Sequence, residues 1–346
     1  MSIQVQRQTL PHAELVVLQE SEPVQLAAVQ ASLSALWRLA SEQVQEEQDA
    51  ALARACLWNL VAYHSNPKRA RGDSAGVAHR IEGLLRLVTV TVPARVVHLE
   101  EWRHEAAPEA GREVEAWVGS HCLHTGSGPH LVCCEQINLA GYGEPGHSHF
   151  PALVRALLVP DLPVALLWLD EVPRKGRLLG QLLQISDRML IDTQQTTEPA
   201  SLQAVNDLHR ASPGKVVDLS WLRLGPLRHL VADFFDTPAR AEQLRHLERV
   251  LIETSPEGRN TGYLLVGWLL SRCGYAKVRS VDRGAQAKEL RWEVQRADGS
   301  WFPLDFQVRE GYGGLDGVFC IQVEAGGDTF ALRDVDAEHM SVQGPD

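Results

Sequence analysis

The residues best suited to chemistry lie in one stretch, positions 131–170, which reads LVCCEQINLAGYGEPGHSHFPALVRALLVPDLPVALLWLD. It contains Gly141-x-Gly143-x-x-Gly146, the spacing of a dinucleotide-binding turn. Asp170 ends the next apolar run, near where such folds place a ribose-binding acid. Glycines in this turn let the backbone approach a pyrophosphate at a helix N-terminus. One hypothesis is therefore an enzyme or sensor that binds NADP or a sugar phosphate here.

Residues in and around the turn oppose this hypothesis. Glu135 falls inside the strand before the turn, where a dinucleotide fold has apolar residues on both faces. Pro145, His147 and His149 crowd the backbone N–H groups that would have to face a pyrophosphate. We therefore expect the turn to be a connection, with Ser148 as the N-cap of the following helix.

Three other kinds of chemistry find little support in the sequence. Residues 146–150 (GHSHF) lack the final glycine of a nucleophile elbow, which argues against a serine hydrolase. The histidine pairs His121/His124 and His147/His149 lack the further ligands that zinc requires. The P-loop sequence GxxxxGK[ST] is absent. We therefore predict no metal site, and no cofactor unless the glycine turn binds one.

Composition indicates a globular protein of two domains. The chain has 346 residues, of which 45% are hydrophobic and 22% charged. Its net charge of −11 argues against a nucleic-acid partner, which requires a basic face. No apolar run approaches the length of a membrane helix, and the start of the chain does not resemble a secretory signal. We therefore expect a cytoplasmic protein whose six cysteines are free thiols, with Cys133 and Cys134 facing opposite sides of one strand.

The elements that must position these residues follow from hydrophobic periodicity. Helices are expected near residues 26–44, 77–88, 175–184, 202–209, 227–235 and 261–273, and strands near 15–18, 56–63, 95–99, 114–118, 131–139, 187–192, 216–219 and 247–253. After residue 288 the pattern alternates, and Asp298-Gly299 predicts a hairpin. The fold class is therefore α/β, with an N-terminal mixed sheet flanked by helices. A C-terminal α+β domain ends in antiparallel strands. Ser212-Pro213-Gly214 sets the predicted domains at 1–211 and 212–346.

Two groups of residues are candidates for contact with a protein partner. A loop rich in glycine, proline and serine carries several basic residues, and three tryptophans stand at the edges of apolar elements beside charged residues. Such tryptophans pack at core edges or anchor interfaces. The candidates are Lys68, Arg69, Arg71, Trp168, Arg223 and Arg272.

Four segments resemble, in the same order, those of the glucose-6-phosphate dehydrogenase assembly protein (OpcA) family. Residues 157–173 (LLVPDLPVALLWLDEVP) are similar to its LLPD-P-V--WWP segment, and residues 187–193 (DRMLIDT) to its short strand. Residues 216–236 (VVDLSWLRLGPLRHLVADFFD) are similar to its DL-W-R---WR-L-A--FD segment. Residues 264–274 (LLVGWLLSRCG) are similar to its L-GWLASR-G helix. The resemblance covers roughly residues 55–274.

The resemblance implies a non-catalytic protein that promotes the assembly and activity of glucose-6-phosphate dehydrogenase in the oxidative pentose phosphate pathway. That enzyme is the implied partner, and the implied action is chaperone-like or allosteric. The chain departs from the family pattern where Leu167-Trp168 replaces the tandem tryptophan and Leu227-Arg228 replaces its WR pair. These departures concern the contact surface more than the fold.

Overall fold

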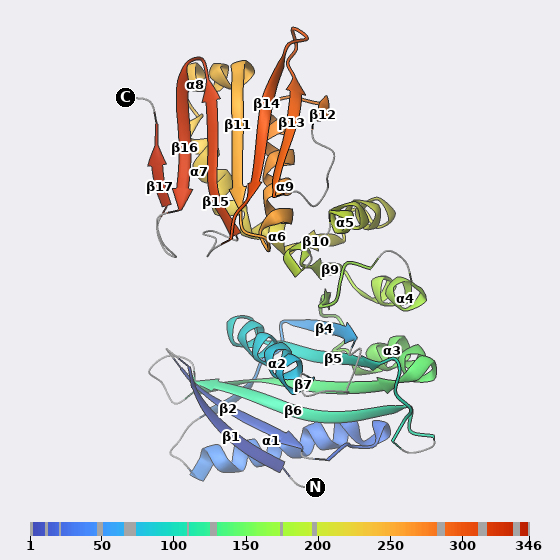
Figure 1. Ribbon diagram of the computed structural model, residues 1–346. Helices are drawn as coiled ribbons and strands as arrows, with labels where there is room; N and C mark the ends of the chain where they lie inside the picture. Colours follow the sequence, from blue (N-terminus) through green and yellow to red (C-terminus); the bar gives the residue numbers. More distant parts are fainter. Residues whose placement is uncertain are drawn as a thin grey trace. The chain divides into compact units, whose positions relative to one another are not determined.

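The chain forms two compact units in the computed structural model, Met1–Leu190 and Ile191–Asp346 (Figure 1). The structure describes residues 3–10, 13–20, 22–46, 51–65, 74–108, 111–124, 130–173, 176–195, 199–281, 288–310, 317–334 and 340–344. The predicted α/β class with two domains is confirmed. The two compact units divide between Leu190 and Ile191, before the boundary expected at residue 212. The domain boundary at residue 212 stays a prediction. The basic loop with Lys68, Arg69 and Arg71 lies outside the described residues.

The first unit is built on a mixed sheet with the strand order β1-β2-β6-β7-β5-β4-β8-β9, and β3 pairs with β7. The strands are β1 (Ile3–Leu10), β2 (Ala13–Glu20), β3 (Ala51–Arg54), β4 (Trp58–Ser65), β5 (Ala94–Trp102), β6 (Val114–His124), β7 (His130–Tyr142), β8 (Val164–Trp168) and β9 (Arg188–Ile191). Strands β7, β5, β4, β8 and β9 run parallel, whereas β1, β2 and β6 pair in antiparallel fashion. The sequence did not predict β1 or β3.

Helices cover both faces of this sheet. They are α1 (Val29–Glu46, after the 3-10 turn Leu26–Ala28), α2 (Ser74–Thr91), α3 (Gly143–Leu157) and α4 (Arg177–Ile185). Adjacent strand residues point to opposite faces, so Cys134 and Glu135 identify the two sides. Glu135 accepts a hydrogen bond from Trp37 on α1, whereas the Cys134 thiol donates to the carbonyl of Thr89 on α2. Helices α1 and α2 therefore lie on opposite faces, as Figure 1 shows.

A buried ion pair lies at the centre of the first unit. Arg95 on β5 and Glu135 on β7 are direct neighbours in the strand register, and their side chains are 6% and 4% exposed. Arg95 Nε donates to Glu135 Oε2 at 2.8 Å, and its Nη1 donates to the carbonyl of Leu157, the last residue of α3. Trp37 Nε1 on α1 donates to Glu135 Oε1 at 2.7 Å. A charged residue in this strand is tolerated because each charge has a partner.

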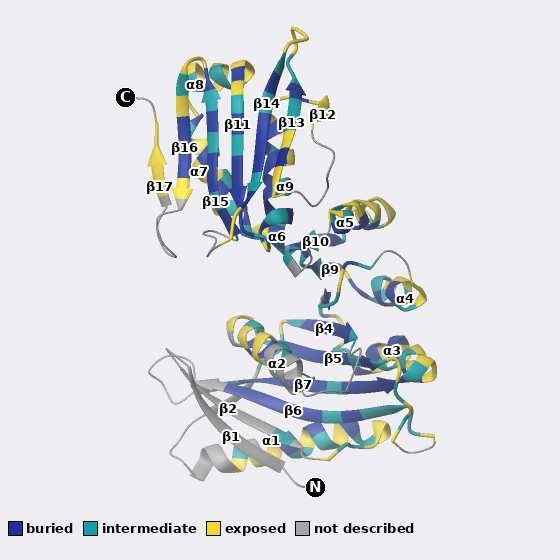
Figure 2. Cartoon of the chain, viewed as in Figure 1, coloured by how far each residue is buried: buried dark blue, intermediate teal, exposed yellow. Residues whose placement is uncertain are grey.

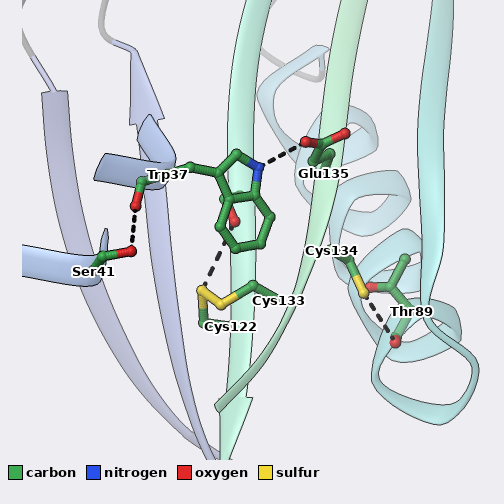
Figure 3. The surroundings of a disulfide bond; sticks show 8 residues. Trp37, Ser41, Thr89, Cys122, Cys133, Cys134 and Glu135 are labelled. Carbon is green, nitrogen blue, oxygen red and sulfur yellow. Dashed lines mark hydrogen bonds between the residues drawn. A yellow bond between two sulfur atoms is a disulfide. The ribbon is translucent and has the colours of Figure 1, made fainter. Parts of the chain in front are cut away.

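Cys122 on β6 and Cys133 on β7 form a disulfide bond (Figure 3). The expectation of free thiols is therefore wrong for this pair. The two residues face each other across the antiparallel register, with 4.0 Å between their Cα atoms. The pairing follows from the register of β6 on β7, which the sequence alone does not give. Cys134 points to the other face, as expected, and burial raises the pKa of its free thiol to about 11.

The second unit carries a sheet with the strand order β12-β13-β14-β11-β15-β16-β17. The strands of this sheet are β11 (Leu247–Thr254), β12 (Val278–Ser280), β13 (Glu289–Gln295), β14 (Trp301–Val308), β15 (Val318–Ala325), β16 (Asp328–Asp334) and β17 (Met340–Gln343). The short strand β10 (Val216–Asp218) lies outside this sheet. Only the β11–β14 pair in this order is parallel, so the predicted antiparallel end of the chain is confirmed. The expected hairpin joins β13 to β14 at Asp298-Gly299, where Gly299 has a φ of 88°.

The helices of the second unit are α5 (Ala200–Ala211), α6 (Leu219–Arg223), α7 (Gly225–Phe234), α8 (Pro238–Gln243) and α9 (Arg259–Arg272), with 3-10 turns at Thr193–Gln195 and Leu244–His246. Residues of α7 and α9 share one apolar core with the sheet. Helix α9 comes close to the sheet at Gly262, because a Cβ there would meet Thr254 at 2.6 Å. Figure 2 shows buried residues along β4, β5 and β7 in one unit and along β11, β14 and β15 in the other. In the described part of the chain, no helix combines the length and apolarity needed to span a membrane.

Replacing Glu135 with alanine should destabilise the first unit strongly, because Arg95 would remain buried without its counter-ion. We expect Glu135→Ala to lower the free energy of unfolding by about 3–5 kcal/mol, measured by urea denaturation followed by circular dichroism. Glu22→Ala, at an exposed position of the same unit, is the control and should change stability little. Equal effects of the two substitutions would contradict a central role for the ion pair.

Three buried histidines should make the first unit sensitive to acid. Burial lowers the pKa of His64 to about 3 and of His98 to about 4, and His98 adds to the shift at His64. Burial and Arg86 lower the pKa of His121 to about 3. Between pH 6.5 and pH 4 the unfolded chain therefore binds protons that the folded chain does not, so stability falls as the pH is lowered.

Each histidine should contribute a slope of about 1.4 kcal/mol per pH unit in that window. His121→Leu should reduce the slope by roughly one such contribution, measured from urea unfolding at pH 7, 6 and 5. An unfolding free energy that does not change between pH 6.5 and pH 4 would rule out neutral buried histidines.

Candidate functional site

The carboxyl ends of β4, β5, β7 and β8 lie along one edge of the first sheet. Helix α2 connects β4 to its neighbour β5, whereas α4 connects β8 to β9 in the opposite direction along the sheet. Helix α4 packs against α3, whose end receives the hydrogen bond from Arg95 on the α1 face, so α2 and α4 lie on opposite faces. Adjacent strands whose connections leave on opposite faces form a crevice, which is where open α/β sheets bind ligands. Here that position lies between β4 and β8.

A pocket of about 740 Å³ opens at this position. Its lining comes from the ends of β4, β5 and β8, the residue after β5, the first turns of α3, and the segment from β8 to the start of α4. The polar and aromatic lining residues are Tyr63, Ser65, Glu101, Arg103, Glu144, His147, Trp168, Asp170, Glu171 and Arg177. The candidate Asp170 and the candidate Trp168 thus share one pocket.

Glu101 is the most enclosed charge in the pocket, with a side chain only 1% exposed. It accepts hydrogen bonds from the Tyr63 hydroxyl and from Arg103, whose Nε is 3.0 Å from Oε1. His147 Nδ1 lies 3.5 Å from the same oxygen. Burial alone would raise the pKa of Glu101, but the hydrogen bonds from Arg103 and Tyr63 lower it below its ordinary value. Burial, followed by the bond to Glu101, raises the pKa of Tyr63. Glu101 is therefore an ionised acceptor held by a neutral phenol.

Asp170 joins the ends of the two strands that flank the crevice. Both of its carboxylate oxygens are 2.9 Å from the backbone N of Ser65, the last residue of β4. Burial raises the pKa of Asp170, and the bond from Ser65 opposes that rise. The Trp168 ring packs on Tyr63 with 4.1 Å between centroids, and its Nε1 donates to the carbonyl of Glu171. Trp168 is therefore a wall of the pocket rather than an exposed anchor.

The three glycines of the turn serve the packing of α3 against β7. A Cβ on Gly146 would come within 2.5 Å of the Glu113 carbonyl oxygen and 2.7 Å of Gly141, and one on Gly141 would meet the Phe150 ring at 2.6 Å. Gly143 has a φ of 61°, which favours glycine. Close packing and the backbone conformation of the turn therefore account for the three glycines without a bound nucleotide.

The start of α3 differs from the expectation. The helix begins at Gly143, so Ser148 lies inside it and its hydroxyl donates to the Pro145 carbonyl at 2.7 Å. The prediction of Ser148 as N-cap is wrong. Tyr142 occupies that position without a capping side-chain bond. The helix therefore begins closer to the end of β7 than the sequence predicted.

The geometry of the pocket disfavours a dinucleotide. In the dinucleotide fold the glycine turn connects neighbouring strands, whereas β5 and β4 separate β7 from β8. Four carboxylates line the pocket against two arginines, Arg103 and Arg177, which opposes a pyrophosphate. Hydroxyl or amino groups would suit these acceptors better. Within the residues that the structure describes, no three histidine, cysteine or acidic side chains gather to hold a metal.

Arg223 and Arg272 lie in the second unit and differ in their surroundings. Arg223 ends α6 and donates to Asp192 at 2.6 Å and to Gln194 at 2.9 Å, which ties α6 to the start of the unit. Arg272 ends α9 and borders an open groove of about 540 Å³ with Arg228 and Trp268. Arg223 is thus held in a structural ion pair, whereas Arg272 reaches an open surface.

Several residues of these sites were not singled out from the sequence. Tyr63, Glu101 and Arg103 each stand at or just after the end of a parallel strand, a position that would have indicated the pocket had the strand order been known. Arg228 was noted only as a departure from a family pattern. Its guanidinium lies over the ring of Trp221, which belongs to the preceding helix, α6.

A substitution at Gly146 tests the structural role of the glycine turn. Gly146→Ala should destabilise the first unit by about 1–3 kcal/mol, because its Cβ meets backbone atoms that cannot move aside. Gly180→Ala on α4, where a Cβ meets nothing within 4 Å, should be neutral or stabilising. Thermal unfolding of both variants is the measurement. A Gly146→Ala protein as stable as the Gly180→Ala protein would exclude the packing role.

Comparison with known proteins gives matches over both units. The model of the glucose-6-phosphate dehydrogenase subunit N-terminal domain matches residues 87–207, and that of its C-terminal domain matches residues 214–310. Three curated relatives are each named as the OxPP cycle protein OpcA. The relative from Nostoc punctiforme is 29% identical over 222 residues, which cover 61% of this chain and 46% of the relative.

The other two relatives are more distant in sequence. The protein from a Synechocystis species is 24% identical over 202 residues, covering 57% of this chain and 40% of the relative. The protein from Synechococcus elongatus is 24% identical over 325 residues, which cover 76% of this chain and 70% of the relative. The chain thus spans less than half the length of the first two relatives. A dehydrogenase structure from Chromobacterium violaceum covers 84% of this chain and 81% of its own at 10% identity, with a TM-score of 0.42, too low to assign a fold or an activity.

Proposed function

Because this chain belongs to the glucose-6-phosphate dehydrogenase assembly protein (OpcA) family, we propose that it is a non-catalytic partner of glucose-6-phosphate dehydrogenase. It binds that enzyme directly and promotes its assembly and activity in the oxidative pentose phosphate pathway. The observation that carries the proposal is the match of both family domains, in order, across the two units. The relatives named OxPP cycle protein OpcA support the same pathway.

The geometry of the first unit supports a non-catalytic role. Two carboxylates of the pocket at β4 and β8 are held by protein donors: Tyr63 and Arg103 donate to Glu101, and the backbone N–H of Ser65 donates to Asp170. A general base or nucleophile needs an acceptor or hydroxyl directed at a substrate. The glycine turn is occupied by helix packing, which favours a protein partner over NADP or a sugar phosphate. We place the activity in the cytoplasm, as the sequence predicts.

An activator of this kind acts through its differential affinity for two states of the enzyme. If it binds the assembled, active form about tenfold more tightly than the inactive form, it shifts the equilibrium by about 1.4 kcal/mol. The effect therefore saturates with the concentration of this chain and requires no turnover by it.

Mixing the two purified proteins tests the proposal. We expect them to co-elute in size-exclusion chromatography, and we expect dehydrogenase activity to rise and then saturate as this chain is added. Heat-unfolded chain at the same concentration is the control and should have no effect. Activity that stays constant together with separate elution would refute the proposal.

A second experiment tests the alternative hypothesis that the glycine turn binds NADP. NADP added to this chain alone should leave its melting temperature unchanged, because the turn packs against β7. Tight NADP binding that Gly143→Asp abolishes would instead support a nucleotide-binding enzyme or sensor.

A further inference from the structure

The groove of the second unit lies between α7 and α9, beside α8 and the 3-10 turn that follows it. Its floor is apolar and includes Val231 and Phe235 from the α7 side, Leu244, and Trp268 and Leu269 of α9. Trp268 is half-buried against the core, so one part of the indole faces the groove. The volume of about 540 Å³ is enough for one or two side chains of a bound segment.

Two arginines border this floor. Arg228 lies with its guanidinium 3.6 Å from the centre of the Trp221 ring and donates to the Trp221 carbonyl at 3.2 Å, so its position is fixed. Arg272 is exposed at the end of α9. Among the described residues neither arginine has an ion-pair partner, whereas Arg249 and Arg291 in the same unit both pair with Asp305.

The two cations also act on each other. Burial, and after it the charge of Arg272, lowers the pKa of Arg228. Two like charges that face one groove leave a positive potential between them, and a bound carboxylate would relieve it. The chain as a whole carries a net charge of −11, so this positive spot is local. Among the described residues that line the groove, Asp236 is the one acid.

We propose that the α7–α9 groove is the docking surface for the dehydrogenase, which inserts a segment that carries a carboxylate side chain next to an apolar one. The inference rests on the proposed function and adds the location and the chemistry of the contact. The carboxylate lies between Arg228 and Arg272, and the apolar side chain packs on Trp268 and Phe235. Tryptophan and arginine are the residues that most often dominate binding energy at interfaces.

The pocket of the first unit fits such a segment less well. Its acidic side chains outnumber its arginines, and Trp168 is packed on Tyr63. An acidic segment would be repelled there, whereas the groove attracts it. The two sites thus differ in the sign of the charge that they present.

Reversal of one charge in the groove tests the inference. Arg272→Glu should weaken the affinity of the full chain for the dehydrogenase about tenfold or more, measured by isothermal titration calorimetry. Arg210→Glu is the matched control, because Arg210 is also exposed and also lies in the last turn of its helix, α5. The Arg210→Glu substitution removes the same kind of interaction with a helix end, but Arg210 lies outside the groove lining. The affinity of this variant for the dehydrogenase should therefore remain within about twofold of that of the unmodified chain.

The outcomes separate the two levels of the proposal. If the unmodified chain binds and Arg272→Glu binds equally well, the docking surface is wrong while the proposed function stands. Equal losses in both variants would show a non-specific charge effect and would also overturn the docking surface. Failure of the unmodified chain to bind overturns both proposals. If Arg272→Glu changes only self-association, measured by sedimentation, the groove contacts a second copy and the inference is wrong.

Discussion

The buried ion pair between Arg95 and Glu135 is the interaction on which the first unit depends. It joins β5 to β7, receives the indole N–H of Trp37 from α1, and holds the last carbonyl of α3 through Arg95. Because a buried charge is costly without a partner, these contacts fix the register of the parallel strands and the end of α3 together. The carboxyl edge of the sheet, with its pocket between β4 and β8, follows from that arrangement.

Two recesses of opposite electrostatic character result from the fold, one in each unit. The pocket of the first unit encloses Glu101 and Asp170, whose carboxylates accept hydrogen bonds from the Arg103 side chain and the Ser65 backbone. The groove of the second unit presents Arg228 and Arg272 without carboxylate partners among the described residues. Groups that satisfy each other stabilise a fold, whereas groups that lack a partner are available to another molecule. This difference favours the second unit as the part that contacts a partner.

The sequence was sufficient for most of the elements and for the fold class, because periodicity and turn residues are local. Asp298-Gly299 marked a hairpin, and residues 261–273 marked a buried helix that the structure places at Arg259–Arg272. It was not sufficient for relations that depend on strand order. The disulfide of Cys122 with Cys133 requires the β6–β7 register, and the pocket around Glu101 requires β4 beside both β5 and β8. The glycine turn resembled a nucleotide-binding turn because close packing and phosphate binding both require glycine.

Hydrogen–deuterium exchange of this chain, alone and mixed with glucose-6-phosphate dehydrogenase, tests the central claim that the second unit makes the contact. We expect slower exchange in α7 (Gly225–Phe234) and in the last turns of α9 (Arg259–Arg272) when the enzyme is present. Residues 141–146 of the glycine turn should exchange at the same rate in both samples. Protection confined to the glycine turn and the ends of β4 and β8, with α7 and α9 unchanged, would contradict the account.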